Sequence, residues 1–180
     1  MQCEAHMASN PTYLTGVERT FEPHEIIVSK TDRQGKITYA NLIFVRVSQY
    51  TEEELLGAPH NIVRHPGMPR CVFKLLWDTI AGGKEIFAYV LNRAKSGDHY
   101  WVFAHITPTF DDRGQIIGYH SSRRVATQKA LEKIKPIYAL LLEEEKKHST
   151  SRLSMAASGD LLNNFLAERK MSYEQFVFTL

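Results

Sequence analysis

The sequence predicts an α+β domain: a five-stranded antiparallel sheet with short helices on one face, followed by a C-terminal helical extension. Two β-prone runs flank a polar turn near the start of the chain. A long helical pattern comes next, and three β-rich runs separated by short polar turns follow it. Consecutive strands joined by short turns are typical of an antiparallel meander. We therefore expect the helices to cover one face of the sheet and to leave room for a pocket.

The first hairpin is predicted between residues 26 and 40. Residues 26–29 and 37–40 are rich in Ile, Val, Thr and Tyr, and residues 32–35 supply Asp and Gly for the turn between them. Short helices are expected directly afterwards. Thr51 is a predicted N-cap, because Glu54 follows it three residues later in the reciprocal pattern of a capping box.

The long helix is predicted over residues 68–81, where apolar residues recur at helical spacing before two glycines end the pattern. The three strands that follow are predicted at residues 86–92, 100–110 and 115–123. The apolar face of the helix needs a surface to pack on. We expect these three strands to provide it.

Two more helical segments are predicted after the last strand. Residues 128–147 are amphipathic, and we expect Pro136 to interrupt that helix. A final amphipathic segment is expected from Asp160 to about Leu180, and its apolar side needs a partner, either this domain or a second copy of it. The predicted organisation is a flexible leader or N-terminal cap at residues 1–20, a central α+β domain at residues 21–126 and a helical extension at residues 127–180.

Length and composition limit the function classes. The 180 residues suffice for one ordinary core, and the formal charge of +2 argues against a nucleic-acid partner. The sequence shows neither a run of roughly 20 apolar residues nor a signal-peptide pattern, so we expect a cytoplasmic protein without membrane insertion. Cys3 and Cys71 are far apart in sequence and are expected to be reduced thiols.

Several segments together resemble the PAS domain of bacterial aerotaxis receptors. They are Thr38-Tyr39-Ala40-Asn41, residues 45–51 and 54–57, the run PHNIVRHPGMP at residues 59–69, Trp77, Asn92-Arg93, residues 96–102 and residues 118–124. The resemblance covers roughly residues 25–139. It implies a PAS fold that binds FAD noncovalently, changes its signalling state with flavin redox, and acts in aerotaxis or chemotaxis through protein contacts rather than through a chemical product.

The resemblance also implies a cofactor site. By position, Arg64 and His65 would lie beside the flavin, and Trp77 and Asn92 would line or support its pocket. These residue types suit FAD, which needs an apolar slot for the ring, directed hydrogen bonds at its polar edge, and cations for the pyrophosphate. The sequence departs from the aerotaxis receptors at Gly67, where they usually have Asp, and in residues 85–89, where they tend to have Trp and Gly.

Each of these residues also has a plain structural interpretation. Arg64 would otherwise form a surface ion pair, Trp77 would be a core residue like Trp101, and Asn92 would pair with backbone at a strand end. His65 is alternatively a turn residue, or the proximal ligand of a heme in a gas sensor of the same fold.

A third possibility is a cofactor-free PAS module that only dimerises. Cys71 does not follow an Asn directly, so a flavin–cysteine photoadduct is not expected. No nucleophile elbow, phosphate-binding loop or kinase signature is present, and enzymatic activity is not predicted. We expect a homodimer that signals to a downstream protein or domain.

Overall fold

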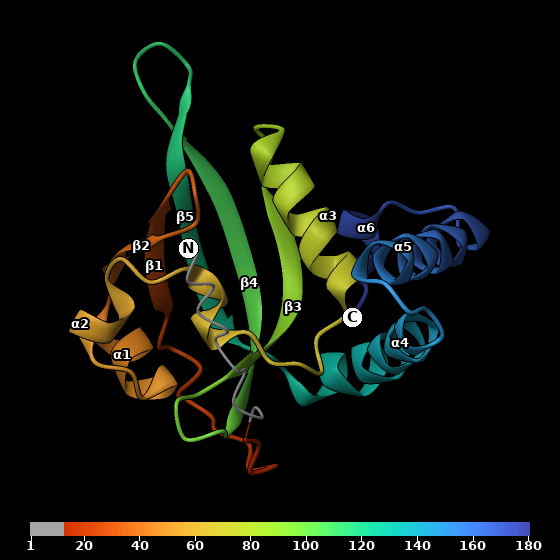
Figure 1. Ribbon diagram of the computed structural model, residues 1–180, viewed down its shortest axis with the longest axis horizontal. Helices are drawn as coiled ribbons and strands as arrows, with labels where there is room; N and C mark the ends of the chain where they lie inside the picture. Colours follow the sequence, from red (N-terminus) through yellow and green to blue (C-terminus); the bar gives the residue numbers. More distant parts are fainter. Residues whose placement is uncertain (1–12) are drawn as a thin grey trace, which may run out of the picture.

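A single five-stranded antiparallel sheet organises the chain in the computed structural model, which describes residues 13–180 (Figure 1). The strands follow the order β2-β1-β5-β4-β3 across the sheet. They are β1 (Ile27–Asp32), β2 (Ile37–Ala40), β3 (Ile86–Arg93), β4 (His99–Phe110) and β5 (Ile116–Val125). β1 pairs with β5, so the N-terminal hairpin and the later meander share one sheet. The predicted α+β class with five antiparallel strands is confirmed.

Two of the three hairpin turns, β1–β2 and β4–β5, use the same side-chain chemistry. In the turn from Asp32 to Gly35, the Asp32 carboxylate accepts hydrogen bonds from two backbone N–H groups, each at 2.9 Å. Asp111 does the same in the β4–β5 turn that ends at Gly114. Both glycines have a positive φ, of 80° and 73°, which non-glycine residues rarely adopt. Local sequence therefore determines where both hairpins reverse.

Short helices connect β2 to the long helix. They are α1 (Leu42–Ser48), α2 (Glu52–Leu55) and the 3-10 turn η1 (His60–Val63), and the long helix is α3 (Arg70–Ala81). Asn41 caps α1 through the N–H of Phe44, and Thr51 and Glu54 form the predicted capping box at α2. α3 packs on β3 and β4, on the same face of the sheet that η1 covers.

The C-terminal helices gather beyond the β3 edge of the sheet, whereas α1 and α2 lie at the β1–β2 side (Figure 1). They are α4 (Gln128–Lys146), α5 (Ser151–Glu168) and α6 (Tyr173–Phe178). α4 contacts the face of the sheet opposite α3, where the Tyr138 hydroxyl donates to the carbonyl oxygen of Tyr89 at 2.7 Å. The ring of Tyr138 also lies 6.1 Å from that of Trp101, which is buried as predicted.

Two expectations about these helices are wrong. α4 continues through Pro136, because Pro136 is exposed while Ile134 and Tyr138 on either side are buried against the domain. That packing outweighs the loss of one backbone hydrogen bond. The next helix begins at Ser151, nine residues before the expected start, with Thr150 as its N-cap.

The apolar tail packs on this same domain. Phe176 and Val177 of α6 are buried, and the Phe178 ring lies 4.8 Å from the ring of Phe87 on β3. A capping box formed by Ser172 and Gln175 starts α6 as a helix separate from α5. Of the two partners expected for the tail, the structure shows the domain itself.

Part of the expected leader is ordered along the sheet. Glu18 forms an isolated parallel bridge with His99, and the Thr15 hydroxyl donates to the Asp98 carboxylate at 2.6 Å. Arg19 forms an ion pair with the same carboxylate, at 3.4 Å. Residues 13–20 thus cover the start of β4, whereas Cys3 lies outside the described residues.

Candidate functional site

A cavity of about 700 Å³ lies between α3 and the inner face of the sheet. Binding sites for small molecules and cofactors commonly have volumes of ~300–1,000 Å³. Its walls come from β1, β3, β4, β5, η1, α3 and α5. Three strands contribute their inward-facing residues, which are Val90, Asn92, Ala104, Ile106, Tyr119, Ser121 and Arg123.

The middle of the cavity is an apolar slot. Val90, Ala104 and Ile106 form its sheet side, and Leu76 and Ile80 of α3 face them. Ala104 is 1% exposed and carries only a methyl group, so the sheet leaves space there instead of filling it. A planar aromatic group fits a slot of this shape, because both of its faces find apolar contacts.

A buried cation lies at the inner end of the slot. Arg123 is 2% exposed, and its guanidinium donates to the Ser29 hydroxyl at 2.6 Å. Its Nε and one terminal nitrogen have no hydrogen-bond partner among the described residues. No carboxylate of residues 13–180 forms an ion pair with it either. Buried charges are normally paired, whereas this guanidinium, which belongs to the cavity lining, leaves two of its nitrogens without a partner among the described residues.

His60 completes this polar group. Its Nε2 lies 3.0 Å from the Ser29 hydroxyl, and its ring stacks on Phe44 at 5.9 Å. Phe44 also lies under Arg123, with the guanidinium carbon 4.4 Å from the ring centre. Burial and the positive charge of Arg123 lower the pKa of His60 to about 3, so its imidazole is neutral. Burial also lowers the pKa of Arg123, to about 10, which leaves it charged at neutral pH.

The opening of the cavity carries positive side chains. Arg64, Arg70 and Lys74 all line it. The Arg64 guanidinium lies over the ring of Phe73 at 4.3 Å and makes no hydrogen bond within the described part of the chain. Arg70 donates to the Ser151 hydroxyl at 2.7 Å, and Lys74 pairs with Asp78. Cations in this arrangement suit a phosphate group held near the surface.

Three of the four residues expected at a cofactor site line this cavity. Arg64 follows η1, and Asn92 lies on β3, where the two residues form an isolated antiparallel bridge. Asn92 is 4% exposed and points inward. Trp77 of α3 lies at the rim, 38% exposed, with its ring edge-on to Tyr119 at 5.5 Å. The structure therefore brings together residues that are up to 28 positions apart in the sequence.

The structure places His65, the fourth residue, outside the cavity lining. Its Nδ1 accepts a hydrogen bond from the N–H of Gly67 at 2.9 Å, and its ring lies 5.9 Å from that of His99. Burial, followed by the charges of His99 and Arg93, lowers the pKa of His65 to about 4. A Cβ atom at position 67 would lie 2.9 Å from this Nδ1. The glycine is what permits this orientation of the ring.

The sequence alone did not identify Ser29, His60 or Arg123 as residues of the site. A signal for Arg123 existed in the alternation of β5, because one of the two adjacent residues Arg123 and Arg124 must face inward. The register that selects Arg123 depends on the pairing of β5 with β1 and β4. Among residues 13–180, no cluster of three or more His, Cys, Asp and Glu side chains suits a metal ion.

A comparison with protein families matches residues 37–123 to the PAS fold. These residues form a PAS domain. The helices of residues 13–180 include none long and apolar enough to span a bilayer.

Relatives of this PAS domain occur in larger proteins. The aerotaxis receptor of Escherichia coli is 43% identical over 135 residues, which cover 75% of this chain and 26% of the receptor. The nitrogen fixation regulatory protein of Klebsiella pneumoniae is 28% identical over 103 residues, covering 57% of this chain and 21% of that protein. The chain thus spans about a quarter of the length of these relatives.

Solved structures share the fold. The dark structure of the blue-light photoreceptor Aureochrome1 LOV superimposes with a TM-score of 0.53 at 22% identity. The superposition covers 67% of this chain and 84% of the photoreceptor chain. Cys71 of the present chain is buried under α5 and is not part of the cavity lining.

Proposed function

We propose that this PAS domain is a redox or oxygen sensor that holds FAD noncovalently in the cavity and signals through protein contacts rather than catalysis. The observation that carries the proposal is the apolar slot that ends at Arg123, a buried guanidinium with unused donors. An isoalloxazine ring has flat apolar faces and a polar edge rich in hydrogen-bond acceptors, and so it complements both parts. When bound, a flavin supplies reversible electron uptake.

The residues around the slot have separate roles in this proposal. Arg123 donates to the polar edge of the ring and favours the redox state that carries more negative charge. Neutral His60 orients Ser29, which in turn holds Arg123. Asn92 offers an amide at the opposite wall, and its side chain makes no other hydrogen bond among residues 13–180. These groups exclude water and fix the orientation of the ring.

FAD rather than FMN is supported by the opening of the cavity. Arg64, Arg70 and Lys74 offer three cations where the pyrophosphate of a dinucleotide would leave the slot. The resemblance to aerotaxis receptors favours the same cofactor. It also supports a place in the cytoplasm and a role in aerotaxis or a related chemotactic response.

Heme is less well supported by the geometry. His65 faces Gly67 rather than the cavity, and His60 has its Nε2 occupied by Ser29. An axial imidazole needs a free nitrogen that points at the metal. Neither histidine meets this condition.

The output of the sensor is proposed to pass through the C-terminal helices, in a homodimer or to a downstream signalling partner. α4 contacts β3 directly through the Tyr138–Tyr89 hydrogen bond, while the neighbouring residues Val90 and Asn92 of the same strand face the cavity. A change in the cavity that moves β3 therefore also changes the contacts of α4. A redox-dependent free-energy difference of a few kcal/mol is enough to shift the equilibrium between two such arrangements of α4.

The deciding experiment is to identify the chromophore. The protein is purified and its visible spectrum recorded, and the ligand is then released with acid and identified by chromatography against FAD, FMN and heme standards. We expect a flavin spectrum and FAD. A Soret band would favour the heme sensor. A colourless protein that takes up neither FAD nor heme, yet elutes as a dimer, would favour the cofactor-free interaction module.

A further inference from the structure

The C-terminal extension forms part of the cavity wall. Ser151 and Met155, both on the first turns of α5, line the cavity together with residues of α3 and the sheet. Figure 1 shows α5 lying against the N-terminal end of α3, and the two helices are in contact. A helix outside the PAS fold match therefore closes the side of the cavity where Arg70 and Arg64 lie.

One buried carboxylate holds three helices together at this point. Glu145 of α4 is 8% exposed, and its Oε1 accepts from the backbone N–H groups of Arg70 and Cys71, at 2.7 and 3.2 Å. The same oxygen accepts from the Ser158 hydroxyl of α5 at 3.0 Å. Pro69 precedes α3 and offers no side-chain cap, so the free N–H groups of this helix depend on Glu145.

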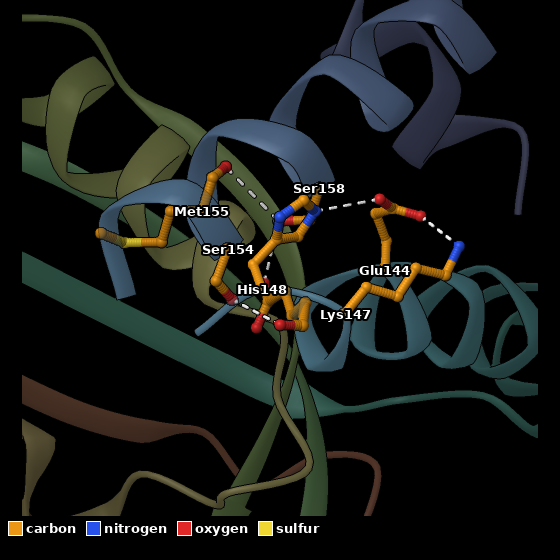
Figure 2. Close-up of polar contacts among 7 residues, drawn as sticks. Glu144, Lys147, His148, Ser154, Met155 and Ser158 are labelled. Carbon is orange, nitrogen blue, oxygen red and sulfur yellow. Dashed lines mark hydrogen bonds and ion pairs between the residues drawn. The ribbon is translucent and has the colours of Figure 1, made fainter. Parts of the chain in front are cut away.

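Further polar contacts fix the start of α5. The Ser154 hydroxyl donates to the backbone carbonyl of Glu145 at 3.0 Å, and Arg70 donates to Ser151. At the C-terminal end of α4, Glu144 pairs with Lys147 at 2.6 Å and lies 3.2 Å from His148 (Figure 2). We use the name Glu145 clasp for Glu145 together with its partners Arg70, Cys71, Ser154 and Ser158.

The two halves of α5 are held by different forces. The buried residues of its first half are Ser154 and Ser158, whereas Leu162 and Leu166 are buried in its second half. When α5 undocks, water can replace the hydrogen-bond partners of Ser154 and Ser158, whereas nothing replaces the apolar contacts that Leu162 and Leu166 lose. The first half of α5 therefore separates from α3 more readily than the second half.

We propose that the first half of α5 is a closure over the cavity, held by the Glu145 clasp, and that ligand occupancy and docking of this closure are coupled. A ligand in the cavity contacts Ser151 and Met155 only while α5 is docked. By linkage, a ligand that gains contacts in the docked state also strengthens docking, and undocking speeds its release. The inference rests on the proposed function only for the identity of the ligand as FAD.

A disulfide lock tests the closure in the full chain. Ser158 lies close to Cys71, because the Ser158 hydroxyl and the backbone N–H of Cys71 both donate to the same carboxylate oxygen of Glu145, at 3.0 and 3.2 Å. Ser158→Cys, in a Cys3→Ser background, is therefore expected to crosslink α5 to α3 on oxidation, and mass spectrometry of the oxidised and reduced protein verifies the bond. Ala156→Cys in the same background is the matched control, because Ala156 is exposed on the same helix.

FAD release is followed by the rise in flavin fluorescence after dilution. The oxidised Ser158→Cys protein is expected to release FAD about tenfold more slowly than the same protein after reduction, while the Ala156→Cys control shows no difference. Glu145→Ala, which removes the clasp, is expected to release FAD about tenfold faster than the parent. Equal rates in the oxidised and reduced Ser158→Cys protein would overturn the closure and leave flavin binding intact.

The same comparison is made without flavin, using 8-anilinonaphthalene-1-sulfonate as the probe of the cavity, an anionic dye whose fluorescence rises when its aromatic rings enter an apolar site. Slower dye entry in the oxidised Ser158→Cys protein supports the closure even if no FAD is bound. Absence of FAD binding together with a redox-dependent rate of dye entry would contradict the proposed function alone. Identical dye entry in both states, with the disulfide verified, would contradict the closure alone.

Discussion

Arg123 is a positive charge placed inside the molecule without a carboxylate partner among the described residues, and its presence needs an explanation beyond stability. Replacing a buried, incompletely paired charge by an apolar residue of similar size is often neutral or stabilising. We therefore expect Arg123→Met to retain or raise the free energy of unfolding of the ligand-free protein. The same change is expected to weaken flavin binding by about one to two orders of magnitude and to lower the flavin reduction potential.

Arg124→Met is the matched control for this prediction. Arg124 is the next residue of β5 and is exposed, so it shares the strand but not the cavity. Urea unfolding measures stability, and flavin fluorescence titration measures affinity. A large loss of stability in Arg123→Met, with flavin affinity unchanged, would assign the guanidinium a purely structural role.

Gly67 controls the direction of a neighbouring imidazole. Any side chain at position 67 begins within 3 Å of the His65 ring, because a Cβ atom there would lie 2.9 Å from Nδ1. We expect Gly67→Asp to displace the ring from its half-buried place and to raise the pKa of His65 from about 4 toward its ordinary value of 6.5, since it also supplies a nearby negative charge. NMR titration of the His65 ring measures this pKa.

Gly67→Ala separates the two causes, because it displaces the ring without adding a carboxylate. The rise in the His65 pKa is expected to be smaller in this variant than in Gly67→Asp. Flavin affinity is measured in both, and tighter binding in Gly67→Asp alone would link the missing acid to cofactor retention. An unchanged His65 pKa in both variants would show that Gly67 does not determine the ring orientation.

At the scale of elements, the turn from Asp32 to Gly35 does more than reverse the chain. Gly35 has a φ of 80°, and a Cβ atom there would lie 2.8 Å from Cη2 of Trp77. Gly35→Ala is therefore expected to lower the free energy of unfolding by about 2–4 kcal/mol, through backbone strain and displacement of the tryptophan. Urea denaturation followed by Trp fluorescence measures both effects.

The β4–β5 turn supplies the comparison. Gly114 has a φ of 73° within the same Asp-to-Gly turn, but nothing lies within 4 Å of a Cβ atom built on it. Gly114→Ala should therefore lose only the strain, about 1 kcal/mol. If Gly35→Ala and Gly114→Ala lost the same amount, the contact with Trp77 would contribute nothing.

Elements governed by local chemistry were predictable from the sequence. The capping box of Thr51 and Glu54 and the two Asp-to-Gly turns depend on residues within four positions of one another. The continuation of α4 through Pro136 and the start of α5 at Ser151 depend on packing against other elements. Neither is visible in the local pattern.

The same limit applies to the candidate site. The resemblance to aerotaxis receptors identified three residues of the cavity lining, Arg64, Trp77 and Asn92, because they lie in segments that match those receptors in the same order along the chain. The group formed by Ser29, His60 and Arg123 comes from three elements, and the contact of Arg123 with Ser29 spans 94 positions. Whether such residues face the cavity depends on strand register and on which elements are neighbours, which a single sequence does not specify.

At the scale of the whole molecule, β3 connects the cavity with α4. On β3, Val90 and Asn92 face the cavity, while the carbonyl of Tyr89 in the same edge strand accepts from Tyr138 of α4.

A neutral histidine, His60, lies beside the buried cation Arg123. This arrangement makes the free energy of unfolding depend on pH, because the folded state opposes protonation of His60.

The direction of this dependence follows from the lowered pKa. His60 has a pKa of about 3 in the folded protein against an ordinary 6.5, so between these values the unfolded chain binds a proton that the folded chain does not. Stability is therefore expected to fall as the pH falls below about 6.5, with His60 contributing about 2 kcal/mol between about pH 7.5 and about pH 5. His60→Gln, measured by urea denaturation at both pH values, should lose that much less stability over the interval. His24→Gln, at an exposed position, should behave as the parent. Parallel pH dependence in His60→Gln and the parent would mean that burial of this imidazole does not oppose its protonation.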